Sequence, residues 1–314
     1  MAVRKVNIAG VGLDLSLDEA GFRHAAATVG PRLGARRIGA SVYEAEPGVP
    51  IWPYHYHHGV EEWLYVVTGA PVLREPAGKR TLAPGDLVCF PSGHRGAHTV
   101  SGPGRFAIFS TGQHVEPYLS VYPDSDKVSG PSGILLRSSA VGYWHGEGTG
   151  SPEPAQVERE PEPSPPQPVV NVASLPGGSL GPLVGAERLD ATVVDMEAPY
   201  HHVHGREDWL LVLSGRPTLR HPHGEDRLEA GDLVCLPEGP AGARALRDPG
   251  ETSARALLLS TTGLPVSVCF PDTGRWLLRN GPDQDWIALR EDERPANASL
   301  SECPRQESNL EPSD

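Results

Sequence analysis

Cysteine, methionine and aromatic residues are scarce in this chain. Its 314 residues include four cysteines and two methionines, and aromatic side chains make up 6% of the sequence. Cys89 and Cys235 lie within apolar runs and are expected to be small buried side chains, while Cys269 and Cys303 have no metal-binding spacing. This low content argues against a disulfide framework.

Long apolar runs and an excess of positive charge are also missing. The sequence contains no apolar run of the roughly 18 residues that a membrane-spanning helix needs, and its first residues reach Gly10, Gly12 and Asp14 before a signal-type region forms. The formal net charge is −13, which gives no cationic field to attract nucleic acid or anionic lipid. We therefore expect a cytoplasmic protein without nucleic-acid or membrane partners.

Glycine and proline, in contrast, are abundant. There are 36 glycines and 33 prolines, and they separate short apolar segments. This pattern of short strands and frequent turns predicts an all-β sandwich or barrel. In the first half of the chain the expected strands are residues 40–46, 62–68, 71–74, 86–90 and 105–110.

One pattern occurs twice, 146 residues apart. Residues 53–69 and 85–98 recur without gaps as residues 199–215 and 231–244. The chain is long enough for two domains that each bury a core. We expect four regions along the chain, in which a Pro/Glu-rich linker joins two units and a disordered tail follows. Their bounds are 1–142 for the first unit, 143–168 for the linker, 169–290 for the second unit and 291–314 for the tail.

Three histidines and one glutamate of the first unit form a candidate metal site. His55 and His57 are two residues apart, so on a strand they project from the same face. Glu62 opens the next strand and His98 lies in a later one, so the four side chains can converge inside one barrel. Imidazoles with a carboxylate suit a divalent transition metal such as Mn, Fe, Co, Ni or Zn, whereas Ca and Mg prefer oxygen ligands. The identity of the ion stays open.

The spacing of these residues resembles the first motif of the cupin superfamily. That motif is matched by His55-x-His57, four residues, Glu62, six residues and Gly69. Glu61 is the alternative carboxylate, but the six-residue count to Gly69 favours Glu62. With the repeat, the resemblance implies a bicupin, in which two tandem jelly-roll cupin β-barrels share one polypeptide.

The second cupin motif is matched less fully. It begins at Gly85 and Pro91, but Gly96 stands where its histidine is expected. His98 lies two positions later and His94 two positions earlier. The sequence Pro-x-Gly-x-x-Gly-Ala-His resembles a variant turn of some cupins, so His98 is preferred as the fourth ligand and His94 stays the alternative.

The second unit keeps only part of this set. The counterparts of His57, Glu62 and His98 are Val203, Asp208 and Arg244, respectively. Valine cannot bind a metal, and a fixed arginine cation repels one. A one-residue slip would instead present the next two histidines of the strand, His202 and His204, but it would turn the strand over. We expect the second unit to support the first, or to bind an anion through Arg244.

The resemblance implies a metal-dependent protein whose ligand is a small molecule. Cupins with such ligand sets include dioxygenases, isomerases and decarboxylases, since an open metal position can polarise a carbonyl group or bind dioxygen. The fold does not choose among these activities or establish that the chain is an enzyme. The alternatives are a non-catalytic metal-dependent binder or sensor, and a structural bicupin. Exposed barrel edges leave a homodimer open as well.

Overall fold

The structure is a computed structural model that describes residues 2–114, 119–140, 164–195, 198–247, 254–281 and 284–290. Regular structure in these ranges is almost entirely β-strand, which confirms the predicted all-β class. No helix in these ranges is long and apolar enough to cross a membrane. Most of the predicted linker and the whole predicted tail lie outside the described residues.

The first unit is a barrel in which a seven-stranded sheet faces two smaller sheets. Its strands are β2 (Leu15–Glu19), β3 (Phe22–Thr28), β4 (Gly39–Ala45), β5 (Tyr56–His58), β6 (Glu62–Gly69), β7 (Val72–Glu75), β8 (Gly78–Thr81), β9 (Asp86–Phe90), β10 (Thr99–Ser101), β11 (Gly104–Ser110), β12 (Leu119–Tyr122), β13 (Lys127–Gly130) and β14 (Gly133–Leu136), with β15 (Val169–Asn171) added from beyond the linker. The large sheet has the order β15-β9-β6-β11-β4-β3-β2, and the small sheets are β10-β7-β8 and β14-β13-β12-β5.

The second unit repeats this architecture with matching strands. They are β16 (Gly178–Ser179), β17 (Leu189–Asp195), β18 (His202–His204), β19 (Asp208–Ser214), β20 (Thr218–His221), β21 (Gly224–Arg227), β22 (Asp232–Leu236), β23 (Ala245–Arg247), β24 (Arg255–Thr261), β25 (Val266–Phe270), β26 (Arg275–Arg279) and β27 (Ile287–Arg290), joined by β1 (Val6–Asn7) from the start of the chain. The sheets are β1-β22-β19-β24-β17-β16, β18-β25-β26-β27 and β21-β20-β23.

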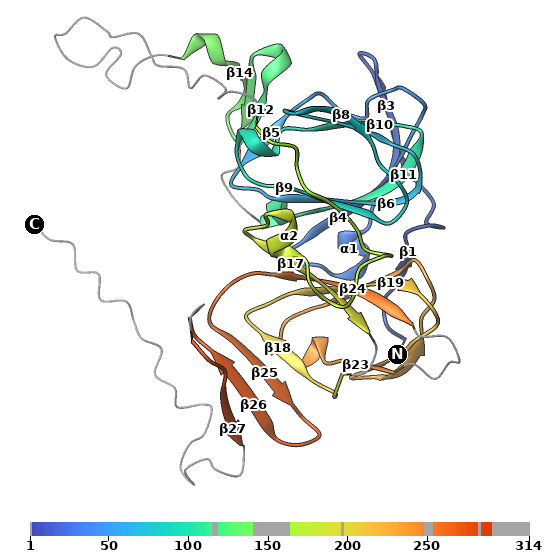
Figure 1. The fold of residues 1–314 in the computed structure, drawn as a ribbon, viewed down its shortest axis with the longest axis vertical. Coiled ribbons are helices and arrows are strands. Elements are labelled where there is room, and N and C mark those ends of the chain that lie inside the picture. Colours follow the sequence, from blue (N-terminus) through green and yellow to red (C-terminus); the bar gives the residue numbers. More distant parts are fainter. Residues whose placement is uncertain are drawn as a thin grey trace, which may run out of the picture.

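The helices are single turns that lie between strands. The α-helices are α1 (Gly30–Leu33) and α2 (Gly181–Val184), and the 3-10 turns are η1 (His94–Gly96), η2 (Thr111–His114), η3 (Pro123–Ser125), η4 (Arg137–Ser139) and η5 (Pro240–Gly242). Each α-helix ends at a glycine with positive φ, Gly34 at 77° and Gly185 at 70°, a conformation that glycine adopts without a steric penalty. Both helices lie at the junction of the barrels (Figure 1).

The two barrels exchange a strand. β1 pairs antiparallel with β22 of the second barrel, and β15 pairs antiparallel with β9 of the first. Asparagines hold the exchanged strands in matching ways, because the side-chain amide of Asn7 donates to Asp232 and that of Asn171 donates to Asp86. The exchange couples the barrels through backbone hydrogen bonds. The bounds given for the two units, 1–142 and 169–290, stay a prediction.

A shared apolar core fills the space between the large sheets. It includes Trp63 and Phe109 of the first barrel and Trp209 of the second, with the Phe109 and Trp209 ring centroids 6.1 Å apart. Each barrel also has its own interior core, to which Leu64 and Leu210 belong. Because side chains alternate along a strand, Trp63 faces the other barrel and its neighbour Leu64 faces the interior of its own barrel.

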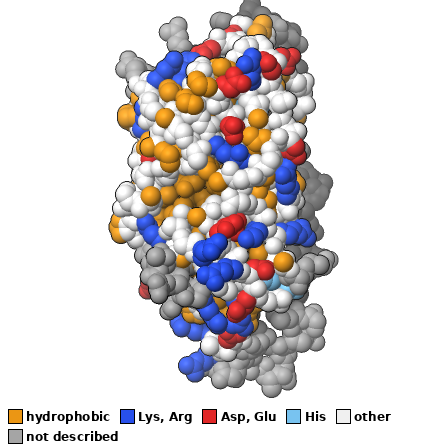
Figure 2. Space-filling model, turned by 90° about the vertical axis from the view of Figure 1, so that its right-hand side faces the viewer, with side chains coloured by type: hydrophobic (Ala, Val, Ile, Leu, Met, Phe, Trp, Pro, Cys, Tyr) orange, Lys and Arg blue, Asp and Glu red, His pale blue; other side chains and the backbone are white. Residues whose placement is uncertain are grey.

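Charged side chains of both signs are interspersed over the outer surface seen in Figure 2, around an apolar strip in the middle of that face. The overall charge is negative, yet this face carries many Lys and Arg side chains next to Asp and Glu. A mixed distribution of this kind produces no continuous field of one sign on the face shown.

Each barrel has one buried glutamate whose carboxylate accepts hydrogen bonds from the backbone of the other barrel. Oε2 of Glu61 accepts hydrogen bonds from the backbone N–H groups of residues 187 and 188, and Oε1 accepts one from residue 189, at 2.7 to 3.0 Å. Glu207 binds the N–H groups of residues 36–38 in the same way, at 2.7 to 3.1 Å. Each carboxylate also accepts the indole N–H of the tryptophan two residues later. We call this reciprocal arrangement the glutamate clamp.

Replacing Glu61 by Gln should lower the stability of the whole chain. The amide removes the charge and presents N–H groups to backbone donors, so at least one buried hydrogen bond is lost, at a cost of about 2 kcal/mol. Urea unfolding of E61Q, followed by tryptophan fluorescence, should show a lower midpoint. E207Q should behave alike, whereas E19Q on the exposed strand β2 should match the wild type. Equal midpoints for E61Q and E19Q would contradict the clamp.

Candidate metal centre

The side chains of His55, His57, Glu62 and His98 converge in the first barrel. Nε2 of His57 lies 3.1 Å from Nε2 of His55 and 3.2 Å from Oε2 of Glu62. Nε2 of His98 lies 3.6 Å from the same glutamate oxygen. One ligand atom each from His55, Glu62 and His98 fall within 4.8 Å of one another, and this is the one group of its kind among the described residues.

A backbone bridge brings together the two distant segments that carry the outer histidines. His55 and His98 are antiparallel partners that exchange both backbone hydrogen bonds, at 3.1 and 2.8 Å. His57 follows on β5, and Glu62 opens β6. The tight turn before His98 requires Gly96, because a Cβ atom there would lie 2.0 Å from the carbonyl oxygen of Pro91. This close approach explains why glycine, and not histidine, occupies that position.

The imidazoles of His55 and His98 are each held by a contact at Nδ1, the ring nitrogen that faces away from the site. Nδ1 of His55 lies 2.9 Å from the carbonyl oxygen of Pro53, and Nδ1 of His98 lies 2.9 Å from that of Gly96. Since a carbonyl oxygen only accepts, both Nδ1 atoms carry the proton and both Nε2 atoms keep a free lone pair. Nε2 of His98 is buried without a hydrogen-bond partner among the described residues. An unsatisfied buried polar atom costs about 1–3 kcal/mol, so this atom fits a bound cation.

The charge states of the site also fit a cation. Burial raises the pKa of the Glu62 carboxyl, but attraction to His57 and a hydrogen bond with it, followed by attraction to His98 and His55, lower this pKa to about 2. Burial and then repulsion from His55 lower the pKa of His98 to about 3, and burial and repulsion from His57 lower that of His55. At neutral pH the carboxylate is ionised and these imidazoles are neutral, which is the state that a metal ion binds.

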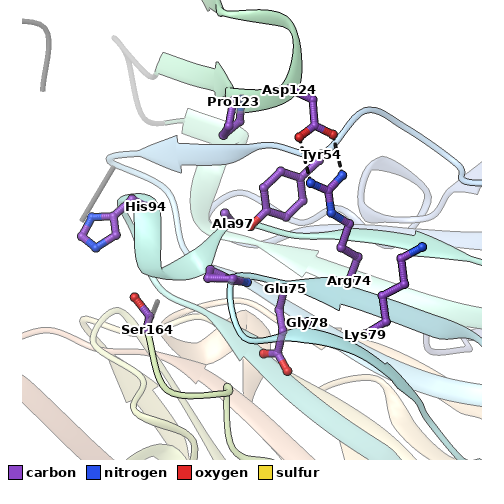
Figure 3. A pocket seen from close by; sticks show the side chains of 11 residues that line it. Tyr54, Arg74, Glu75, Gly78, Lys79, His94, Ala97, Pro123, Asp124 and Ser164 are labelled. Carbon is purple, nitrogen blue, oxygen red and sulfur yellow. Dashed lines mark hydrogen bonds and ion pairs between the residues drawn. The ribbon is translucent and has the colours of Figure 1, made fainter. Parts of the chain in front are cut away.

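His94 lies apart from this group. It begins η1 and lines an outer pocket of about 580 Å³ together with Tyr54, Arg74 and Asp124 (Figure 3). His58 also faces away from the site, because it follows His57 on β5 and is exposed. Of the two histidines that the sequence left open as the fourth ligand, the structure therefore brings His98 to the other three.

The second barrel holds a buried ion pair at the matching place. His201 and Arg244 form the same backbone bridge as His55 and His98, and the guanidinium of Arg244 donates to the carboxylate of Asp208. Both charged residues are buried, at 5% and 2% exposure. Asp208 thus occupies the anion position that the sequence suggested for an external ligand of Arg244.

The register of β18 excludes the slipped histidine pair. Val203 lies opposite Val268 of β25, and His202 and His204 lie on the other side of β18, where both rings contact Trp276. The gap-free alignment of the two repeats is therefore correct, and the slip of one residue is wrong. The second barrel has a valine where the first has His57.

Comparison with known proteins identifies the architecture. Residues 41–111 match the family model of the cupin domain. A solved mutant of Bacillus subtilis oxalate decarboxylase is 14% identical, covering 85% of this chain and 79% of that chain with a TM-score of 0.50. The chain has a bicupin fold, with a cupin domain at residues 41–111. At this identity the structural likeness shows the bicupin fold alone.

Two further structures resemble parts or most of this bicupin. One is a structure of Bacillus subtilis oxalate decarboxylase from work on its Mn(II) centres. It is 13% identical over 85% of this chain and 79% of that chain, with a TM-score of 0.47. The other, a putative sugar phosphate isomerase from Acidithiobacillus ferrooxidans, is 24% identical over 39% of this chain and 80% of that chain, with a TM-score of 0.35. No curated protein matches the chain.

Aromatic rings and one serine complete the surroundings of the site in this bicupin. The ring of Phe90 stacks on His98 at 3.7 Å between centroids, and Tyr122 stacks on His55 at 5.9 Å. The ring of Trp52 is edge-on to both histidines. Sequence reasoning missed Tyr122 and Ser120, because β12 lies far from both cupin motifs and has no motif of its own.

Replacing His98 by Ala should weaken metal binding, whereas replacing His94 by Ala should not. The first change removes one of the converging nitrogens, and the second changes a side chain in the outer pocket. Elemental analysis after dialysis against Mn²⁺ or Co²⁺ should show less metal per chain for H98A than for H94A and the wild type. Equal losses in both variants would contradict the choice of His98.

Replacing Arg244 by Met should destabilise the second barrel, because it leaves the buried carboxylate of Asp208 without its cation. Removing one partner of a buried pair costs about 3–5 kcal/mol. The double variant R244M/D208L removes both charges and should recover much of this loss. Urea unfolding of the single and double variants tests the expectation, and equal stability of R244M and the wild type would contradict it.

Proposed function

We propose that the first barrel binds one divalent transition metal through His55, His57, Glu62 and His98, and that it uses this ion to act on a small metabolite. The observation that carries the proposal is the convergence of three imidazole Nε2 atoms on one ionised carboxylate. Nitrogen ligands with one oxygen ligand favour Mn, Fe, Co, Ni or Zn over Ca or Mg. A relative in fold, the oxalate decarboxylase, is described with Mn(II) centres.

The exposure of the four side chains supports access from one side. His98 and His55 are 1% and 8% exposed, whereas the side chains of His57 and Glu62 are each 16% exposed. A small ligand therefore reaches the site past His57 and Glu62, while the rings of Trp52 and Phe90 exclude water behind the other two histidines. When bound, the metal supplies Lewis-acid chemistry that polarises a carbonyl or carboxylate oxygen, or it orients dioxygen.

The ligand set of the site favours an oxygen-bearing ligand. A divalent transition metal held by imidazole nitrogens and one carboxylate oxygen would complete its coordination with a carbonyl, carboxylate or water oxygen. Metabolites with 1,2-dioxygenated or β-dicarbonyl groups, and small dicarboxylates, fit this requirement.

The metal-loaded protein should convert at least one compound of these classes. Oxygen uptake and carbon dioxide release would be measured with a panel of 1,2-dioxygenated compounds, β-dicarbonyl compounds and oxalate. Any conversion should disappear in E62Q and in chelator-treated protein, because both remove metal from the site. E19Q is the matched control, since it makes the same change at an exposed position of strand β2, away from the site. Full metal occupancy without conversion of any compound would count against an enzyme.

A second candidate is a metal-dependent binder or sensor without catalysis. The observation that favours it is that the acid or base groups nearby are used elsewhere or point away from the site. Glu61 is committed to the glutamate clamp, while His58 and His94 point away from the four converging side chains. A binder would raise its melting temperature with a small ligand and leave that ligand unchanged.

Metal binding itself predicts a rise in stability for both candidates. A ligand that binds only the folded state stabilises it by about 2.7 kcal/mol when the free ligand is about 100-fold above Kd. Adding Mn²⁺ or Co²⁺ to chelator-treated protein should therefore raise the melting temperature, and H55A should lose this rise. An unchanged melting temperature would favour a structural bicupin without a functional metal.

A further inference from the structure

The internal duplication shows which residues accompany the histidines of the first barrel. His57 on β5 is the antiparallel partner of Ser120 on β12. At the matching place in the second barrel, Val203 on β18 is the partner of Val268 on β25. The second barrel, which lacks the converging histidines and glutamate, thus has valines at the places of both His57 and Ser120.

Ser120 contacts the ring of His57 directly. Its Oγ lies 2.9 Å from Nδ1 of His57, and the serine is 5% exposed. The contact differs from those of the neighbouring histidines, because His55 and His98 use backbone carbonyl groups that no side-chain substitution removes. His57 is therefore the one imidazole of the set whose Nδ1 atom is held by another side chain.

The second barrel separates general features of the fold from features of the site. His201 keeps the backbone contact of its counterpart His55, with Nδ1 2.7 Å from the carbonyl oxygen of Pro199, although no metal set surrounds it. The backbone contact therefore occurs with or without the other histidines. The serine contact, in contrast, occurs in the first barrel, where His57 is present, and the second barrel has a pair of valines there.

We propose that Ser120 is a positioning residue that fixes the imidazole of His57 with Nε2 directed at the metal. The inference rests on the proposed function of the first barrel. Nε2 of His57 lies 3.1 Å from Nε2 of His55 and 3.2 Å from Oε2 of Glu62. With an ion bound, the hydroxyl oxygen of Ser120 would accept the Nδ1 proton and the Nε2 lone pair would face the ion. Without Ser120 the ring loses the contact at its Nδ1 atom, and its orientation is less restricted.

A salt bridge on the outer surface secures the strand that carries Ser120. Arg74 of β7 donates two hydrogen bonds to Asp124, which lies just after β12, and its guanidinium lies 4.0 Å from the ring centroid of Tyr54 (Figure 3). Arg220, Asp272 and Tyr200 repeat this arrangement in the second barrel. Because both barrels have it, the salt bridge belongs to the common framework and Ser120 belongs to the site.

The test compares three substitutions of Ser120 in the full chain, with Co²⁺ as the probe. S120A and S120V remove the acceptor, and S120V copies the second barrel. S120T retains a hydroxyl group. Loss of an outer contact to a metal-binding histidine lowers affinity about 10–100-fold, so S120A and S120V should bind Co²⁺ that much more weakly in calorimetric titration. S120T should restore most of the affinity, and the visible spectrum of bound Co²⁺ should change in S120A and S120V only.

The matched control is S260A, which removes a buried serine of the second barrel, 8% exposed. It should leave both affinity and spectrum unchanged. Wild-type affinity and spectrum in S120A would overturn the proposal. An equal loss in S120A and S120T would also overturn it, because the effect would then come from packing and not from the hydroxyl group. The melting temperatures of the metal-free variants show whether each is folded.

Metal binding by the first barrel and the role of Ser120 are tested by separate outcomes. If wild type and H57A both fail to bind Co²⁺ and Mn²⁺, the proposed function is wrong and the role of Ser120 falls with it. If wild type binds, H57A does not, and S120A equals wild type, the metal site stands and the role of Ser120 alone is overturned.

Discussion

A carboxylate inside an apolar barrel needs a positive partner, and this constraint organises both halves of the molecule. An isolated buried charge is strongly unfavourable, so it is paired or binds a metal. In the second barrel the partner of Asp208 is the guanidinium of Arg244, which is part of the chain. In the first barrel Glu62 faces three imidazoles, of which His55 and His98 have lowered pKa values. A metal ion bound there, as proposed, would supply the positive charge.

The same backbone frame presents these different partners. The bridge between His55 and His98 recurs as the bridge between His201 and Arg244, so the fold places the fourth side chain independently of its chemistry. A histidine at this place leaves a lone pair directed at the carboxylate. An arginine fills the space with a fixed cation. The duplication has therefore produced one barrel open to an ion and one barrel closed by its own ion pair.

The candidate site is also connected to the junction of the barrels. Glu61 and Glu62 are consecutive, yet one carboxylate binds the backbone of the other barrel and the other faces the histidines. Alternation along the strand makes this division unavoidable, because neighbouring side chains point to opposite faces of the sheet. Trp63 then returns to the junction, where it is fully buried. The start of β6 is thus held from both sides, which limits the freedom of Glu62.

Much of this arrangement follows from the sequence because strand periodicity is simple. Two residues of separation put His55 and His57 on one face, and the spacing to Gly69 separated Glu62 from Glu61. The choice between His98 and His94 needed the turn at Gly96, whose close approach to Pro91 depends on atoms that the spacing does not describe.

The exchanged strands were beyond the reach of the sequence for a related reason. β1 has two residues and β15 has three, too few to show alternation. Their partners lie far away in the chain, so only the folded structure reveals the pairing.

The second barrel supplies an internal comparison that a single-barrel protein lacks. Features that both barrels keep, such as the glutamate clamp and the exchanged strands, are needed to build and join the barrels. Features found in one barrel alone do not serve that purpose, since the other barrel folds without them. His57 and Ser120 are such a pair, because Val203 and Val268 pack at the same place. Burying a polar pair costs more free energy than burying two valines, so packing alone does not account for His57 and Ser120 in the first barrel. The proposed binding of an ion by the imidazole would offset this cost.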